Sequence, residues 1–218
     1  WNNFNISEKN IKNSRRAYFA NISYLDDKIG EILGTLQKTN QEAVIIFVSD
    51  HGDMIGERGL WFKMSFFESS SRVPLMISST VLEPKLVAEP VSTIDVCSTL
   101  CDLAGCDMDE VAGWTEGESL LPFASGSIRT NAVLMEYAAE ASYAPLISIR
   151  KGRFKYNRCD IDPEQLFDLE SDPNELHNLA SLQNFSEELT EFQRISEAKW
   201  DLASFDKGVR KSQAQRWI

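Results

Sequence analysis

The 218-residue sequence predicts an α/β fold, the later part of a layered α/β domain followed by a small antiparallel sheet with helices. Residues 43–48 form a continuous apolar run rich in β-branched side chains, typical of a strand buried on both faces of a parallel sheet. Helical spacing over residues 11–36 precedes that run, and alternating apolar residues flank Gly152 further on. We therefore predict an α/β unit at residues 1–125 and an antiparallel sheet with helices at residues 126–218.

The elements of the first unit follow from local patterns. Gly34 and the polar residues 37–41 are expected to end the first helix. A second buried strand is predicted at 73–78, a helix at 92–104 that ends at Gly105, and a loop at 113–126. The first helix carries apolar residues three or four positions apart: Tyr18, Ile22, Leu25, Ile29 and Leu33.

The second unit begins with a strand predicted at 131–137. A hairpin is expected over 146–156, because the apolar residues alternate on both sides of a Lys-Gly turn. Residues 174–182 are expected to form a short helix. Residues 186–216 are expected to be helical and polar, with one apolar stripe made of Phe192, Ile195 and Trp200.

Composition is that of a soluble globular protein, with 43% hydrophobic and 25% charged residues. The net charge of -11 argues against nucleic-acid binding, which needs a basic face. No apolar run approaches the roughly 20 residues that span a bilayer, so we expect no membrane association. The chain does not begin with Met and shows no signal-peptide pattern. We therefore expect it to start inside a longer protein, and to be cytoplasmic unless a signal lies upstream.

The four cysteines are Cys97, Cys101, Cys106 and Cys159. Their positions show neither zinc-ligand spacing nor a Cys-x-x-Cys redox motif. The pattern favours small buried apolar residues in a reducing compartment.

An Asp–His pair directly after residues 43–48 carries the chemistry. Ligands of open α/β sheets bind just outside the carboxyl ends of the strands. Asp50 offers a hard oxygen and His51 a neutral nitrogen, and both can turn toward one cation. The glycine-rich loop that follows can bring Lys63 back over the site as a charge for an anionic group; on spacing alone, a capping role for the pair and a solvated lysine remain alternatives. The glycines are Gly52, Gly56 and Gly59.

Residues 49–68, SDHGDMIGERGLWFKMSFFE, resemble the second metal motif of the sulfatases of the alkaline phosphatase superfamily. Residues 72–75 resemble the strand that follows that motif, and the resemblance extends over about residues 15–180. Within the family, residues 56–68 and the hairpin segment 149–155 are most similar to choline-sulfatases. The family's C-terminal signature is matched by residues 166–169, Asp172, Pro173, Glu175 and residues 178–180.

This resemblance implies the C-terminal portion of a sulfatase-type α/β/α sandwich. It implies that Asp50 and His51 coordinate a divalent cation, calcium in most members, with magnesium or manganese as alternatives, and that Lys63 contacts the sulfate group. The other metal ligands and the formylglycine nucleophile would lie upstream of the chain. Residues 97–101 do not supply the nucleophile motif, because Thr99 stands where Pro or Ala is needed and the motif's Arg is missing.

The implied activity is hydrolysis of a sulfate ester, choline-O-sulfate to choline and sulfate, by a full-length homo-oligomeric enzyme. Carboxylates and aromatic faces bind a quaternary ammonium. Glu136 and Glu140 are candidate carboxylates, and Tyr137 and Tyr143 are candidate aromatic residues; ordinary surface or core roles are the alternative. Two other functions stay open: another sulfatase or phosphonate monoester hydrolase, and a non-catalytic structural or assembly fragment.

Overall fold

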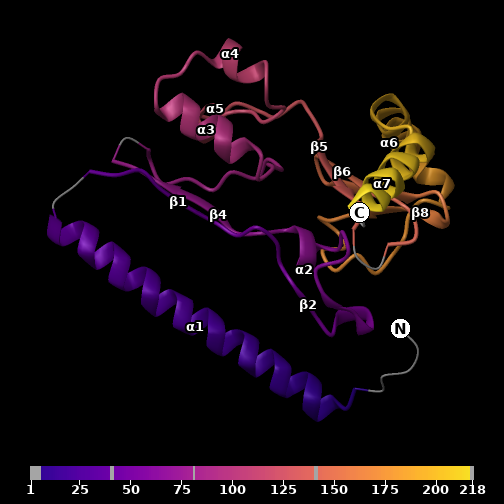
Figure 1. Cartoon of the computed structure of the whole chain (residues 1–218), viewed down its shortest axis with the longest axis horizontal. Coiled ribbons are helices and arrows are strands. Elements are labelled where there is room, and N and C mark those ends of the chain that lie inside the picture. The colour runs from indigo at the N-terminus through magenta and orange to yellow at the C-terminus, as the bar shows by residue number, and fades with distance from the viewer. Residues whose placement is uncertain (1–5, 40–41, 81, 140–141, 217–218) are drawn as a thin grey trace. The chain divides into compact units, whose positions relative to one another are not determined.

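A computed structural model describes residues 6–39, 42–80, 82–139 and 142–216. The chain divides into two compact units, one formed by residues 1–63 and 69–82 and the other by residues 64–68 and 83–218. Figure 1 labels most of the helices and strands of both units. The predicted division near residue 125 stays a prediction. No described helix is both long and apolar enough to cross a membrane.

The first unit opens with α1 (Glu8–Thr39), which confirms the predicted helix and extends it at both ends. The helix passes through Gly34 and ends at Thr39, within the polar residues 37–41 that were expected to end it. A single glycine costs a helix only about 1 kcal/mol, and helix-forming residues on both sides outweigh that cost. Along its predicted apolar stripe, Ile22 and Leu25 are exposed by 48% and 57%.

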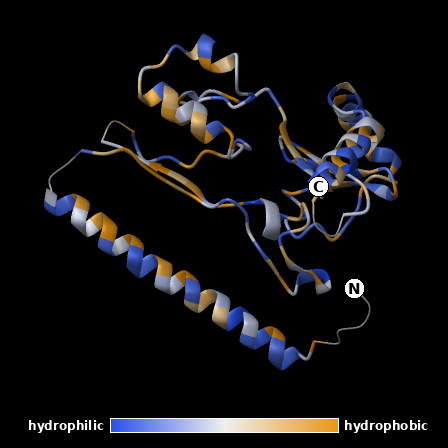
Figure 2. Cartoon of the chain, viewed as in Figure 1, coloured by the Kyte–Doolittle hydropathy of each residue, from blue (hydrophilic) through white to orange (hydrophobic). Residues whose placement is uncertain are grey.

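Strands β1 (Ile45–Val48) and β4 (Leu75–Ser78) confirm the two predicted strands. They form an antiparallel ladder in which Ile45 faces Ser78 and Val48 faces Leu75. The expected burial within a parallel sheet is not found, since Phe47 and Val48 are each 37% exposed. Burial of both faces requires a layer on each side, and no described residues of this unit supply one. Figure 2 shows the apolar character of both strands.

The rest of the first unit is the loop after β1. It contains the short hairpin β2 (Met54–Ile55) and β3 (Trp61–Phe62), joined by the 3-10 turn η1 (Glu57–Gly59). Helix α2 (Glu68–Ser71) begins in the second unit and ends in the first.

Three short helices, α3 (Asp95–Leu103), α4 (Met108–Ala112) and α5 (Leu121–Ala124), begin the long part of the second unit. The predicted helix at 92–104 is confirmed in α3. The segment expected to be a loop, residues 113–126, contains α5. Pro122 in the first turn of α5 fits a helix start, because proline has no N–H to leave unpaired there.

The centre of the second unit is a four-stranded antiparallel sheet in the order β5-β6-β7-β8. The predicted strand at 131–137 is β5 (Val133–Tyr137), and the predicted hairpin is β6 (Leu146–Lys151) and β7 (Phe154–Cys159), with Gly152 in the turn at φ 53°. The fourth strand, β8 (Asp162–Asp168), was not among the predicted elements.

Two C-terminal helices follow the sheet, and the first of them packs against it through Phe192. The predicted helix at 186–216 is two helices, α6 (Ser186–Lys199) and α7 (Leu202–Gln215), because Asp201 caps a new helix start by accepting the Ser204 N–H. The 3-10 turn η2 (Gln183–Phe185) leads into α6. The core of the unit is made of residues from β6, β7, β8 and α6, with the Tyr156 and Phe192 rings stacked 5.9 Å apart: Ile149, Tyr156, Leu166 and Phe192.

The short helix expected at 174–182 is wrong, because this segment is irregular. Glu175 has φ of 55°, a left-handed conformation that a right-handed helix cannot contain. The Asn178 side chain pairs with the backbone instead, accepting from the N–H groups of Leu166 and Ala180. The segment therefore lies along β8 as an ordered loop.

Candidate active site

The Asp–His pair lies in a tight turn directly after β1. The Asp50 Oδ1 accepts the His51 N–H at 2.9 Å, and the Ser49 hydroxyl donates to the His51 carbonyl oxygen at 2.9 Å. The first of these bonds lowers the pKa of the Asp50 carboxyl below its ordinary value. The carboxylate is 83% exposed, so it is charged and accessible at neutral pH.

The His51 ring is oriented by its neighbour. The Nδ1 atom lies 2.9 Å from the carbonyl oxygen of Gly52. A carbonyl oxygen only accepts, so Nδ1 carries the proton and Nε2 is the accepting nitrogen of the neutral ring. Nε2 lies 3.5 Å from the Asp50 Oδ2 and 3.0 Å from the Lys63 Nζ. One imidazole nitrogen, one carboxylate oxygen and one ammonium group therefore converge.

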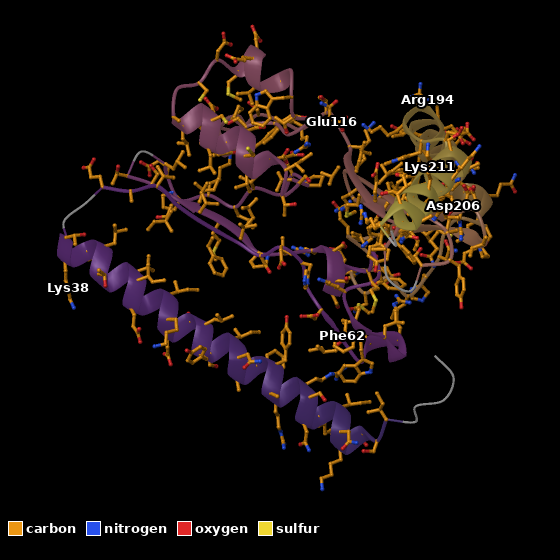
Figure 3. All side chains as sticks on the ribbon, in the orientation of Figure 1. Lys38, Phe62, Glu116, Arg194, Asp206 and Lys211 are labelled. Carbon is orange, nitrogen blue, oxygen red and sulfur yellow. The ribbon has the colours of Figure 1, made fainter. Side chains whose placement is uncertain are left out.

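The β2–β3 hairpin returns Lys63 to this place. Met54 pairs with Phe62, so the residue after Phe62 comes back level with the start of the loop. Gly56 and Gly59 adopt φ of 105° and 71° in the connection, a conformation that costs glycine little. Phe62, labelled in Figure 3, has φ of 67°, which is strained for a side chain of its size. The loop thus places the Lys63 Nζ 3.0 Å from the His51 Nε2, and the role of Lys63 toward an anionic group stays a prediction.

Gly52 has a different role from the other two glycines. Its N–H donates to the Ser70 carbonyl oxygen at 2.8 Å, and a Cβ at this position would lie 2.2 Å from the Ser69 carbonyl oxygen. Only a residue without a side chain fits so close to another backbone segment. The Ser70 hydroxyl also donates to the Lys63 carbonyl oxygen at 2.6 Å. Ser70 thus holds both ends of the loop, a role that no sequence signal indicated.

Helix α1 braces the outer side of the loop. The Arg15 Nε donates to the Ile55 carbonyl oxygen at 2.9 Å, and its guanidinium lies 3.2 Å from the Glu57 carboxylate. Desolvation and the nearby negative charge of Asp53 raise the pKa of Tyr18. These contacts fix the loop without contributing to the convergent groups themselves.

Asp50 and His51 fit two positions of a divalent cation's coordination shell. The set combines a hard carboxylate oxygen and a neutral imidazole nitrogen, and the Nδ1–H bond to Gly52 is the outer-shell contact that orients such a ligand. Within the described ranges, no group of three His, Cys, Asp or Glu side chains could hold a metal. The pair therefore fits part of a metal site.

The other predicted site residues belong to the second unit. The Glu136 carboxylate accepts the Trp200 indole N–H at 2.5 Å, and Tyr143 is 84% exposed. Tyr137 is a half-buried residue of β5. Glu140 lies outside the described residues.

The cysteines differ in part from their expected burial. Cys97 and Cys106 are exposed, and only Cys159 is buried. In the helix that carries Cys97, the buried residues are instead Asp95, Ser98 and Thr99, which face the rest of the unit.

Two family models match the chain. The Sulfatase model matches residues 2–106, and the model described as N-sulphoglucosamine sulphohydrolase, C-terminal, matches residues 56–199. Asp50, His51 and Lys63 lie within the segment that the Sulfatase model matches. The chain belongs to the sulfatase family.

Among curated relatives, the chain is 56% identical over 223 aligned residues to a choline-sulfatase of Rhizobium meliloti, covering 100% of this chain and 44% of that protein. It is 35% identical to arylsulfatase K of Bos taurus, covering 76% of this chain and 33% of the relative. The chain thus spans less than half the length of these relatives.

Among solved structures, a phosphonate monoester hydrolase of Agrobacterium radiobacter matches with a TM-score of 0.72 and 27% identity, covering 87% of this chain and 42% of that one. A phosphonate monoester hydrolase of Silicibacter pomeroyi matches with a TM-score of 0.73 and 24% identity, over 86% of this chain and 41% of that one. These neighbours confirm the predicted α/β fold class.

Proposed function

We propose that the protein containing this chain hydrolyses sulfate esters, and that Asp50, His51 and Lys63 form part of its active site. The observation that carries the proposal is their convergence, with the His51 Nε2 within 3.5 Å of both the Asp50 Oδ2 and the Lys63 Nζ. Membership of the sulfatase family supports the same reaction class. We expect the nucleophile to come from outside these 218 residues.

Each side chain has a distinct task in this proposal. The Lys63 ammonium contacts a sulfate oxygen and stabilises the negative charge that redistributes as the ester bond breaks. Asp50 and His51 hold a divalent cation, calcium in the first place and magnesium or manganese as alternatives. When bound, such a cation polarises the sulfate group as a Lewis acid. The Gly52 carbonyl keeps the His51 Nε2 available by holding the proton on Nδ1.

We propose choline-O-sulfate as the ester. The 56% identity to a protein named choline-sulfatase supports this choice. Glu136 and Glu140 are the proposed carboxylates for the quaternary ammonium, with Tyr137 and Tyr143 as aromatic contacts. Because Glu136 already accepts the Trp200 indole N–H, its carboxylate is held in one orientation.

The test uses the full-length protein and measures sulfate released from choline-O-sulfate. Lys63→Met should lower kcat/KM by about 100- to 1000-fold, the usual cost of losing one group that stabilises transition-state charge. The matched control is Lys38→Met, which removes a lysine from the last turn of α1. Unchanged activity in Lys63→Met, or an equal loss in Lys38→Met, would contradict the assignment.

A second variant tests the metal ligands. Asp50→Ala combined with His51→Ala should abolish turnover and weaken calcium binding measured by calorimetry. If the double variant kept both its turnover and its calcium binding, Asp50 and His51 would be excluded as metal ligands.

The isolated 218-residue chain should show no turnover, and a measurable rate would overturn the expectation of an external nucleophile.

Phosphonate monoester hydrolysis is the second candidate function. The solved structure from Agrobacterium radiobacter, with a TM-score of 0.72, favours it. A panel of a choline sulfate ester, an aryl sulfate and a phosphonate monoester separates the candidates by their kcat/KM values.

A further inference from the structure

The C-terminal end of α3 brings two cysteines together. After the C-cap residue Ala104, Gly105 adopts φ of 75°, and its N–H donates to the Asp102 carbonyl oxygen at 3.0 Å. The Cys106 N–H donates to the Cys101 carbonyl oxygen, also at 3.0 Å. This pair of bonds is the Schellman motif, in which the side chains corresponding to Cys101 and Cys106 usually make an apolar contact. Here both of these positions are occupied by cysteines.

A third thiol lies on the same face of the helix. Cys97 precedes Cys101 by four residues, so the two side chains are neighbours on the surface of α3. Desolvation raises the pKa of the Cys101 thiol, and Cys106 and Cys97 raise it further. Cys101 is therefore the middle member of a row of three thiols.

Reagents in solution can reach this row. Cys97 and Cys106 are exposed and Cys101 is half-buried, whereas Cys159 on β7 is buried with 8% exposure. All four cysteines are described, and all carry free thiols. Oxidation of the folded chain should therefore begin at Cys97 or Cys106 and spare Cys159.

We propose that Cys101 and Cys106 form a reversible thiol–disulfide modification site, oxidised by a peroxide and restored by a dithiol reductant. A disulfide needs Cβ atoms about 3.5–4.5 Å apart. Residues four apart within a helix keep their Cβ atoms about 5–6 Å apart, which disfavours a bond between Cys97 and Cys101. Cys106 lies beyond the last helical residue, so its side chain is free of that constraint.

The oxidation balances with hydrogen peroxide as the oxidant. The Cys106 thiolate attacks one peroxide oxygen, and the O–O bond breaks to give a sulfenic acid and hydroxide. The Cys101 thiol loses its proton and attacks the sulfenic sulfur; the S–S bond forms and the sulfenic oxygen leaves as water. In total, two thiols and one peroxide give one disulfide and two waters. The new bond would tie the last turn of α3 to the segment leading into α4.

Peptide mass spectrometry on the folded 218-residue chain tests the proposal. After peroxide treatment, free thiols are alkylated and the chain is cut before aspartates, which separates residues 95–101 from residues 102–106. We expect these two peptides to be joined by a bond that a dithiol breaks. The joined pair should persist in Cys97→Ser and Cys159→Ser, and fall at least about tenfold in Cys101→Ser and Cys106→Ser.

Two outcomes would overturn the proposal. One is a joined pair at wild-type yield in Cys101→Ser, which would assign the bond to Cys97 and Cys106. The other is oxidation that ends only in sulfinic or sulfonic acids on separate cysteines. A chain unfolded in guanidinium chloride is the control for the role of the helix end. In that chain, the Cys101–Cys106 disulfide should no longer form in preference to a Cys97–Cys101 disulfide. A preference that persisted would also overturn the proposal.

Discussion

The loop at residues 49–63 and the β5–β8 sheet are held in place by different kinds of interaction. The loop relies on backbone geometry: positive φ at Gly56 and Gly59, and the close approach of Gly52 to residues 69 and 70. The sheet relies on buried side chains, with Ile149 and Tyr156 both fully buried. The chemical groups of the candidate site consequently lie near the surface, with Asp50 and Lys63 exposed and His51 half-buried, while the stability of the second unit comes from its interior.

A buried charge cluster marks the second unit in particular. Lys155 is fully buried; its Nζ lies 2.5 Å from a Glu175 oxygen and 2.9 Å from a Glu68 oxygen, and donates to the Phe66 carbonyl oxygen at 2.6 Å. The other Glu175 oxygen accepts the Glu68 N–H at 2.7 Å. The cluster attaches residues 66–68 to the sheet. By contrast, the Lys63 of the first unit is exposed and faces a single imidazole.

The largest effect is expected from breaking this cluster. Lys155→Met should lower the free energy of unfolding of the second unit by about 3–5 kcal/mol, because it leaves buried carboxylates without their cation. Urea unfolding followed by circular dichroism measures the loss. The control is Lys155→Met with Glu175→Gln, which removes charge from both sides and should be milder. If Lys155→Met alone were as stable as wild type, the prediction would be contradicted, because solvent or other groups would then satisfy the carboxylates.

A smaller effect is expected where the first unit depends on backbone proximity. Gly52→Ala places a methyl group 2.2 Å from the Ser69 carbonyl oxygen, so the loop must shift, at about 1–3 kcal/mol. Hydrogen exchange of residues 49–70 should increase while exchange in β6 and β7 stays unchanged. The matched control is Gly30→Ala, where nothing lies within 4 Å of the new methyl group and the helix should gain stability. Equal exchange in both variants would contradict a packing role for Gly52.

The same contrast explains what could be predicted from sequence. Periodicity located α1, β1, β4, α3, β5 and the Gly152 hairpin, because each pattern reflects a local preference of the chain. The Asp–His pair after a predicted strand and the resemblance to the sulfatase motif indicated Asp50, His51 and Lys63 as candidate site residues, because the order of these residues and the glycines is itself local. The burial of β1 could not be predicted, because burial depends on neighbours distant in sequence.

The missed features have non-local or conformational causes. Ser70 supports Gly52 and Lys63 through one carbonyl and one hydroxyl, and any residue has the first of these. The helix expected at 174–182 does not form, because Glu175 adopts a positive φ and its carboxylate joins the buried charge cluster. Neither fact leaves a trace in hydrophobic spacing.

The smallest effect is expected in the pH dependence of stability, to which one tyrosine of each unit contributes. Burial and the Glu164 carboxylate raise the pKa of Tyr156, while desolvation and Asp53 raise that of Tyr18. A raised folded-state pKa means that the stability is complete below the ordinary tyrosine pKa of about 10 and is lost as pH rises above it. At pH 11, the folded second unit keeps a protonated Tyr156 that the unfolded chain would ionise, which costs about 1.4 kcal/mol.

Tyr156→Phe isolates this contribution. At pH 8 the variant should be less stable than wild type, because Glu164 loses the phenol hydroxyl that donates to it. Between pH 8 and pH 11 the stability difference between wild type and variant should narrow by about 1.4 kcal/mol, since only wild type loses stability through this group. For Tyr18→Phe, at a half-buried position of α1, the stability difference from wild type should decrease less over the same pH range. An equal change in the stability difference for Tyr156→Phe and Tyr18→Phe would mean that the sheet interior raises the tyrosine pKa no more than the surroundings of Tyr18 do. The contrast between the two regions would then not hold for these tyrosines.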